Sequence, residues 1–271
     1  MFAHEFVRNA WLAGTAVAAA SGLVGWGLVW RGQLFAGDAL SHVAFTGAVA
    51  AAALGADPRI GLFVACAAMG AAMAGTGRRG APDDAAIGVS FAWVLGLGAL
   101  CLALYESSAA AGMPTLGPRT LFGSVFGLSA AEAQLAAVVA VGVAVAMLTM
   151  ARPLLLCTLD PAVAAARGLP VRRLGIAFLV VAGVQAGEAA QAVGALLLLG
   201  LLAAPAASAR RLTAAPWPGL ALSVGLAVGA TWVGLTLAYL LPGLPPSTAI
   251  VVVACGGYGA VAGWDGLRGG W

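Results

Sequence analysis

Residues 132–150 read EAQLAAVVAVGVAVAMLTM, a run in which no charged side chain follows Glu132. A helix needs about 20 predominantly apolar residues to cross the hydrocarbon core of a bilayer, and this run approaches that length. Similar runs recur on both sides of it, so the sequence predicts an all-α, polytopic integral membrane protein. We expect about eight to nine transmembrane helices, because two of the runs are short and can pair as a hairpin. The nine candidate spans are 11–30, 38–56, 60–76, 85–105, 132–150, 173–188, 192–209, 217–240 and 247–263.

The composition agrees with a membrane protein and excludes several other classes. Of the 271 residues, 62% are hydrophobic and 8% are charged, whereas soluble domains carry about 25% charged residues. All 13 basic residues are arginines, scattered in ones and twos without a basic stripe, so no nucleic-acid partner is expected. The four cysteines are far apart, which argues against a disulfide framework and a thiolate metal site. No GxxxxGK[ST] phosphate loop occurs, so any ATP-driven motor must be another polypeptide.

The span boundaries carry helix-start signals. Asp57 precedes Pro58, as an N-cap followed by proline at the first helical position. Asp83 or Asp84 can cap the next span, and Ser129-Ala-Ala-Glu132 fits a capping box.

Arginine placement predicts the orientation of the spans. Arg78-Arg79, the stretch 152–173 and Arg210-Arg211 should face the cytoplasm, and the segments 106–130 and 241–247 should face outward. Nine spans then place the N-terminus outside and the C-terminus inside. Arg59 is a mild exception, since it falls on the outer side.

The polar insertion at 151–173 contains a short predicted helix. Asp160 can cap it, Pro161 fits its first position, and Gly168 fits the left-handed position after its end. Pro170 prevents continuation. From these residues alone, an interfacial helix and a docking helix for a cytoplasmic partner are equally good interpretations.

Asp38 and His42 lie four residues apart, on one face of a predicted helix. A carboxylate and an imidazole held in this way can bind one small cation, and ionisable groups inside a membrane are functional candidates by default. The competing interpretation is local: Asp38 follows Gly37 at a plausible helix start and can serve as its cap.

Four short stretches occur in order along the chain. They are Gly37-Asp-Ala-Leu-Ser-His-Val-Ala-Phe45, Asp84-Ala-Ala-Ile-Gly88, Leu121-Phe-Gly-Ser124, and Val193-Gly-Ala-Leu-Leu197 running to Ala204-Pro-Ala-Ala207. As a set they resemble the metal-ion permease family of bacterial ATP-binding-cassette (ABC) importers, the manganese, zinc and iron type, over residues 10 to 260.

The resemblance implies a function. Residues 1–271 would form a single transmembrane permease domain in the bacterial cell membrane, a transport subunit and not an enzyme. It would pair with a second permease copy, bind two cytoplasmic ATPase subunits, and receive the ion from an extracytoplasmic metal-binding protein. It would hold no permanent cofactor; a divalent zinc, manganese or iron ion would be its cargo.

The resemblance also implies roles for individual residues. Asp38 and His42 match the acid-and-histidine motif of the family, which is implicated in the ion pathway. The short helix would be the coupling helix on the ATPase. Its implied residues are Asp160, Pro161, Ala165, Arg167 and Gly168.

The chain departs from the family pattern at two positions. Thr46 stands where the family often has proline. Glu188 lies where no acid is expected in the family. The slightly favoured interpretation is an exposed acid at the membrane interface. The alternative, a weak candidate role, is an acid that lines an outer vestibule and attracts cations.

Asp38 and His42 supply two ligands, which is about half of what a metal site needs. Zinc usually takes about four ligands, so a dimer that doubles the pair favours a transient site at its interface. The metal is not determined, because imidazole favours zinc and carboxylate suits manganese or iron.

Three rival functions remain open at this point. One is a permease for haem or an iron chelate, with a wide apolar pore. Another is a proton-coupled secondary transporter in which Asp38, His42 and Glu188 relay protons. The third is a membrane scaffold that does not transport.

Overall fold

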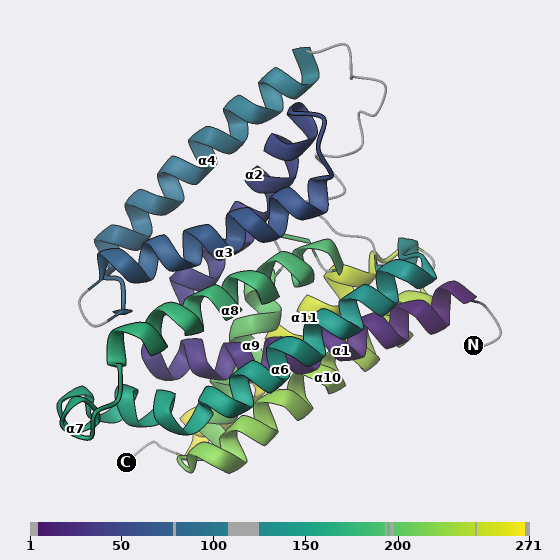
Figure 1. Cartoon of the computed structure of the whole chain (residues 1–271). Coiled ribbons are helices and arrows are strands. Elements are labelled where there is room, and N and C mark those ends of the chain that lie inside the picture. The colour runs from purple at the N-terminus through teal and green to yellow at the C-terminus, as the bar shows by residue number, and fades with distance from the viewer. Residues whose placement is uncertain are drawn as a thin grey trace.

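The computed structural model describes residues 5–77, 80–107, 125–192, 194–195, 198–241 and 243–268. Within them the chain is a helical bundle without strands (Figure 1). The helices are α1 (Glu5–Arg31), α2 (Leu34–Ala53), α3 (Pro58–Thr76), α4 (Asp84–Ser107), α6 (Ala130–Leu159), α7 (Pro161–Ala166), α8 (Val171–Ala192), α9 (Leu198–Leu212), α10 (Pro216–Leu240) and α11 (Pro246–Arg268), with a 3₁₀ turn, η2, at Val125–Gly127.

Eight of the described helices are long and apolar enough to cross a membrane, which confirms the predicted number. The remaining candidate, predicted at 192–209, is α9, which has 15 residues and is too short to be counted with them. Several boundaries differ from the prediction: α1 begins at Glu5 and not at 11, and α9 begins at Leu198 and not at 192. Helix α2 begins at Leu34 and not at 38, and α6 continues through Pro153 to Leu159. The irregular part of the predicted 151–173 insertion is therefore confined to the residues around α7.

Helix α1 lies at the centre of one half of the bundle, where it packs against α6, α9 and α10. Helix α8 lies between α1 and α3, and it also contacts α2 and α6. Helix α4 packs mainly against α2 and stands at the edge of the bundle (Figure 1). Helix α4 is thus the least enclosed of the spanning helices in the described chain, whereas most of α2 is buried.

Glycines allow the helices around α2 to approach closely. A Cβ atom built on Gly61 of α3 would overlap the carbonyl oxygen of Gly47 in α2. A Cβ atom on Gly183 of α8 would overlap the carbonyl oxygen of Cys66 in α3. Small residues at crossing points are the usual means of helix association in membranes. The close packing of α2 against α3 therefore requires glycine, which has no side chain, at the crossing point.

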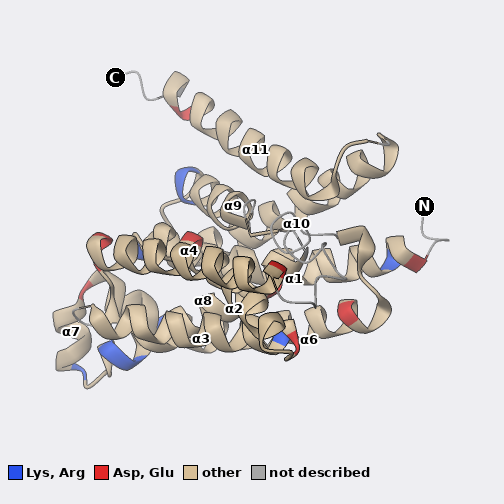
Figure 2. Cartoon of the chain, turned by 90° about the horizontal axis from the view of Figure 1, so that it is seen from above, with Lys and Arg blue, Asp and Glu red and all other residues tan. Residues whose placement is uncertain are grey.

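The charged residues lie mostly near helix ends (Figure 2). One end of the bundle collects arginines from α1, α6, α8 and α9, and by the positive-inside rule it faces the cytoplasm. Arg78 and Arg79, which the predicted orientation also used, lie outside the described residues. The same holds for the family-like stretch 121–124 and for residues 193 and 196–197. The arginine end is joined by hydrogen bonds from Arg31 Nη1 to Thr158 Oγ1 (3.5 Å), Arg210 Nη1 to Val29 O (3.3 Å) and Arg172 Nη2 to Gly75 O (3.2 Å).

Candidate ion pathway and coupling helix

The turn before α2 explains why this helix begins earlier than expected. Gly32 adopts φ 65°, a left-handed conformation that glycine tolerates best. The Gln33 N–H donates to the carbonyl oxygen of Leu28 (2.8 Å), which closes the end of α1. Helix α2 then begins at once, with Gln33 as its N-cap residue and no side-chain capping bond.

Asp38 is consequently not a helix cap, and the local interpretation of this residue was wrong. It lies inside α2, one turn before His42 on the same face. The position of the pair in the membrane also differs from the terminal one expected. Cys66 Sγ donates to the carbonyl oxygen of Leu40 at 3.6 Å, and Leu40 also lies beside Gly183. Both neighbours are near the middle of their helices, so Asp38 and His42 lie at about mid-height in the bundle.

The two side chains belong to a stripe of α2 that its neighbours leave partly open. Phe35 is 70% exposed, and Asp38, His42 and Phe45 are half-buried, at spacings of one helical turn. The opposite face, which includes Leu40, is buried against α3 and α8. The polar pair therefore points away from the protein core.

Few groups in the described chain engage this pair. The His42 ring meets the Phe91 ring of α4 edge-to-face, with 5.0 Å between centroids. Ser41 Oγ donates to the backbone oxygen of Asp38 (2.6 Å) and not to its carboxylate. No cluster of three His, Cys, Asp or Glu side chains that could hold a metal occurs among the described residues. One copy of the chain therefore supplies two ligands at this place.

Thr46, where the family often has proline, has a clear structural role. Its Oγ1 donates to the carbonyl oxygen of Val94 in α4 at 3.0 Å. Gly98, one turn further along α4, leaves room for this hydroxyl. The bond ties α4 to the same side of α2 that carries His42.

Glu188 is buried, so the favoured expectation of an exposed interfacial acid was wrong. Its side chain lies near the outer end of α8 and is 5% exposed. Its Oε2 atom has no hydrogen-bond partner among the described residues. The nearby positive group that acts on it is Arg59 of α3. The structure does not bring Glu188 together with Asp38 and His42, because these face away from α8.

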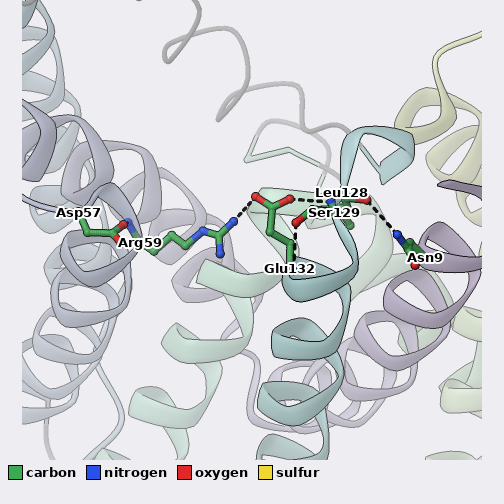
Figure 3. A network of polar contacts seen from close by, with 6 residues as sticks. All are labelled: Asn9, Asp57, Arg59, Leu128, Ser129 and Glu132. Atoms are coloured by element: carbon green, nitrogen blue, oxygen red, sulfur yellow. Dashed lines mark hydrogen bonds and ion pairs between the residues drawn. The ribbon is translucent and has the colours of Figure 1, made fainter. Parts of the chain in front are cut away.

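Sequence reasoning missed the partner of Arg59. This guanidinium forms an ion pair with Glu132 of α6, so the two helices are joined at the outer end (Figure 3). Glu132 also completes the predicted capping box by accepting from the Ser129 N–H at 2.7 Å. Asp57 caps α3 through the Arg59 N–H at 2.9 Å, as predicted. Two signals in the sequence could have indicated this pair. Arg59 was an exception to the orientation rule, and Glu132 is an acid at a helix start on the same side of the membrane.

The short cytoplasmic helix α7 forms as predicted. Asp160 Oδ1 accepts from the N–H groups of Ala162 (3.0 Å) and Val163 (2.9 Å), and Pro161 occupies the first position. Gly168 has φ 77°, and the Leu169 N–H donates to the carbonyl oxygen of Ala164 (3.1 Å) in a Schellman-type end. Ala164 is buried, whereas Ala165, Arg167 and Gly168 are exposed. The helix therefore presents one face outward from the arginine end.

Comparison with known proteins identifies the family. Residues 3–259 match the model of the ABC 3 transport family. The chain belongs to this family. The predicted resemblance to the metal-ion permeases of ABC importers is thereby confirmed, as are the all-α fold and the multi-pass location in a bacterial cell membrane.

Members of the ABC 3 transport family similar to this chain include curated permeases. One is the manganese import system permease protein ScaB of Streptococcus parasanguinis, 28% identical over 88% of this chain and 83% of that protein. Another is the manganese transport system membrane protein MntC of Listeria monocytogenes, 27% identical over 93% of this chain and 88% of that protein. These relatives are transport permeases and not enzymes.

The solved structure of PsaBC from Streptococcus pneumoniae in complex with Fab has the same fold. The TM-score is 0.82 at 24% identity, over 96% of this chain and 91% of the matched chain. At this identity the likeness supports the arrangement of the helices and not the cargo.

Proposed function

We propose that this chain is the permease subunit of an ATP-driven importer of a divalent transition-metal ion, with Mn²⁺ as the first candidate cargo. The observation that carries the proposal is the carboxylate–imidazole pair on α2, at about mid-height in the bundle and on the stripe that faces out of the chain. Relatives named as manganese permeases support the choice of metal. The oxygen ligand of Asp38 suits Mn²⁺, and His42 adds a nitrogen ligand of intermediate softness.

A second copy of the chain completes the site in this proposal. Two ligands cannot fill the coordination shell of a divalent metal, whereas two copies related by a two-fold axis supply two carboxylates and two imidazoles. A site shared between subunits is also easy to open, because a shift of one copy separates its ligands. Such a site releases the ion, as transport requires.

The proposed partners occupy the two ends of the bundle. The exposed face of α7, with Ala165, Arg167 and Gly168, docks on a cytoplasmic ATPase subunit. An extracytoplasmic metal-binding protein delivers the ion to the opposite end. The support for these partners is the ABC family and the position of α7 at the arginine end.

Uptake by the reconstituted complex tests the function. The permease, its ATPase and its binding protein are placed in proteoliposomes, and ⁵⁴Mn²⁺ entry is measured with ATP and with a hydrolysis-deficient ATPase. Zn²⁺ and Fe²⁺ are added as competitors to define the cargo. We expect ATP-dependent entry that falls at least about 10- to 100-fold in Asp38→Asn and in His42→Ala, since loss of even a group that supports a metal ligand commonly costs this much.

Asp265→Asn is the matched control, because Asp265 of α11 is a partly exposed acid that pairs with Arg211 (3.7 Å). It should keep wild-type uptake. Wild-type uptake in Asp38→Asn or His42→Ala would refute the site. Entry driven by a proton gradient without the ATPase would show the chain to be a secondary transporter.

A further inference from the structure

Three buried polar atoms on consecutive turns of α8 have no hydrogen-bond partner among the described residues. They are Gln185 Oε1, Glu188 Oε2 and Gln191 Nε2. The residues are three apart, so each side chain is a neighbour of the next on the helix surface. Unpaired polar atoms in a membrane interior are costly. Two of the three, Gln185 Oε1 and Glu188 Oε2, are acceptors on neighbouring turns, so a proton shared between them would satisfy both.

The amide orientation of Gln185 is fixed by its contacts. Its Nε2 donates to the carbonyl oxygen of Val17 (3.1 Å) and to Ser21 Oγ (3.0 Å), both on α1. A backbone carbonyl can only accept, so the nitrogen must face α1 and Oε1 must face away from it. Gln185 is 0% exposed, and its oxygen is an acceptor that requires a donor inside the protein.

An ionised Glu188 cannot provide that donor, because a carboxylate only accepts hydrogen bonds. With an ionised Glu188, Gln185 Oε1 and Glu188 Oε2 are two acceptors that cannot satisfy each other. A protonated Glu188 can donate its own O–H to Gln185 Oε1. One proton thus links Glu188 through Gln185 to α1.

The charges around Glu188 also allow one more proton. From α3 the group that faces it is Arg59, and this guanidinium is already paired with Glu132 of α6. Helix α1 contributes the uncharged Ser21, which Gln185 of the neighbouring turn binds, and Asp38 and His42 of α2 lie on the face turned away from α8. Two carboxylates and one arginine leave one uncompensated negative charge at this place. A buried charge without its own partner is disfavoured.

We propose that Glu188 is a proton-binding site, which holds a neutral carboxylic acid hydrogen-bonded to Gln185 in the closed outer end of the bundle. The carboxylate takes one proton from water when it is enclosed. The acid returns the proton to water when the contacts of α8 with α3 and α6 open. The bonds that change are the O–H of Glu188 and its hydrogen bond to Gln185. The site is independent of the cargo of the ion pathway, because it lies on a different face of the bundle.

Infrared spectroscopy of the full chain in lipid nanodiscs at pH 7 tests this site. We expect the carbonyl band of a protonated carboxylic acid, sensitive to exchange in D₂O, in the wild type. The band contribution should be lost in Glu188→Gln and kept in Asp38→Asn. Absence of the band in the wild type, or its persistence in Glu188→Gln, would overturn the proposal.

Thermal unfolding of two variants gives a second, independent readout. Glu188→Gln should keep the wild-type midpoint, because its amide can donate to Gln185 as the acid does. Glu188→Ala should unfold at a lower temperature, since it leaves Gln185 Oε1 without a donor. A Glu188→Gln variant that is destabilised or does not fold would show that the ionised form is the native one, and would reject the proton site.

Discussion

Asp38 and Glu188 are both acids inside the bundle, but their surroundings differ. Asp38 is half-buried on the partly open stripe of α2, with His42 one turn away. Glu188 is enclosed among α1, α3, α6 and α8, beside two glutamines of its own helix. An acid on an open face can exchange ligands with a partner or an ion. An enclosed acid retains what it binds until the surrounding helices move.

The largest expected effect concerns whether a second copy covers the open stripe. In a variant with the four cysteines replaced by alanine, Phe35→Cys should form a disulfide-linked dimer in membranes under mild oxidation. Phe35 lies one turn from Asp38, so a shared ion site places its two copies near the same axis. Non-reducing electrophoresis should show most of the protein as dimer.

Val138→Cys on α6 is the control for this cross-link, since Val138 is 69% exposed against 70% for Phe35. It should stay largely monomeric. Equal cross-linking at both positions would mean that the stripe faces lipid like any other exposed surface. The difference between the two acids would then be one of burial alone.

A second way to break the comparison is to displace α2. Gly61→Ala introduces a methyl group against the backbone of Gly47, and overpacking of this kind costs about 1–3 kcal/mol. We expect a lower unfolding temperature and reduced uptake, because α2 carries both pathway residues. Gly75→Ala on the same helix is the control, since its Cβ would meet no atom within 4 Å. Equal stability of the two variants would contradict the tight α2–α3 crossing.

Much of the fold follows from local signals that need no knowledge of packing. Apolar runs defined the spans, and the capping patterns at Asp57, Ser129 and Asp160 each appear as hydrogen bonds. The start of α2 was misplaced because Leu34 to Gly37 carry no cap signal, and the tight turn at Gly32 allows an immediate restart. Local patterns specify where helices can end, but not how soon the next begins.

The candidate site was less predictable than the fold. The spacing of Asp38 and His42 showed that they share a helical face, but only packing shows that this face is open. Burial of Glu188 depends on α6 and α3 closing over α8, which involves residues more than 50 positions away in the chain. The ion-pathway and coupling roles of these residues remain predictions.

Asp57 and Asp160 each cap the start of a helix, and they serve as a reference for the two acids inside the bundle. Asp160→Ala and Asp57→Ala each remove a side-chain cap before a proline, at a cost of about 1 kcal/mol. Both should lower the unfolding temperature by similar small amounts. Only Asp160→Ala should also weaken co-purification of the ATPase, because it loosens α7. Equal loss in both variants would indicate a global effect and would not support a coupling role.

The smallest expected effect comes from the ion pair that lies beside Glu188. Arg59→Met removes the partner of Glu132 and keeps the capping box of α6 intact. The two side chains are 34% and 31% exposed, so solvent screens the pair, and its loss should cost at most about 0.2–1 kcal/mol. If Glu188 were ionised and held by Arg59, the same change would strand a buried charge and cost several times more. Thermal unfolding of Arg59→Met therefore distinguishes the two charge states, and a midpoint close to wild type, with the carboxylic-acid band retained, is the outcome that a neutral Glu188 requires.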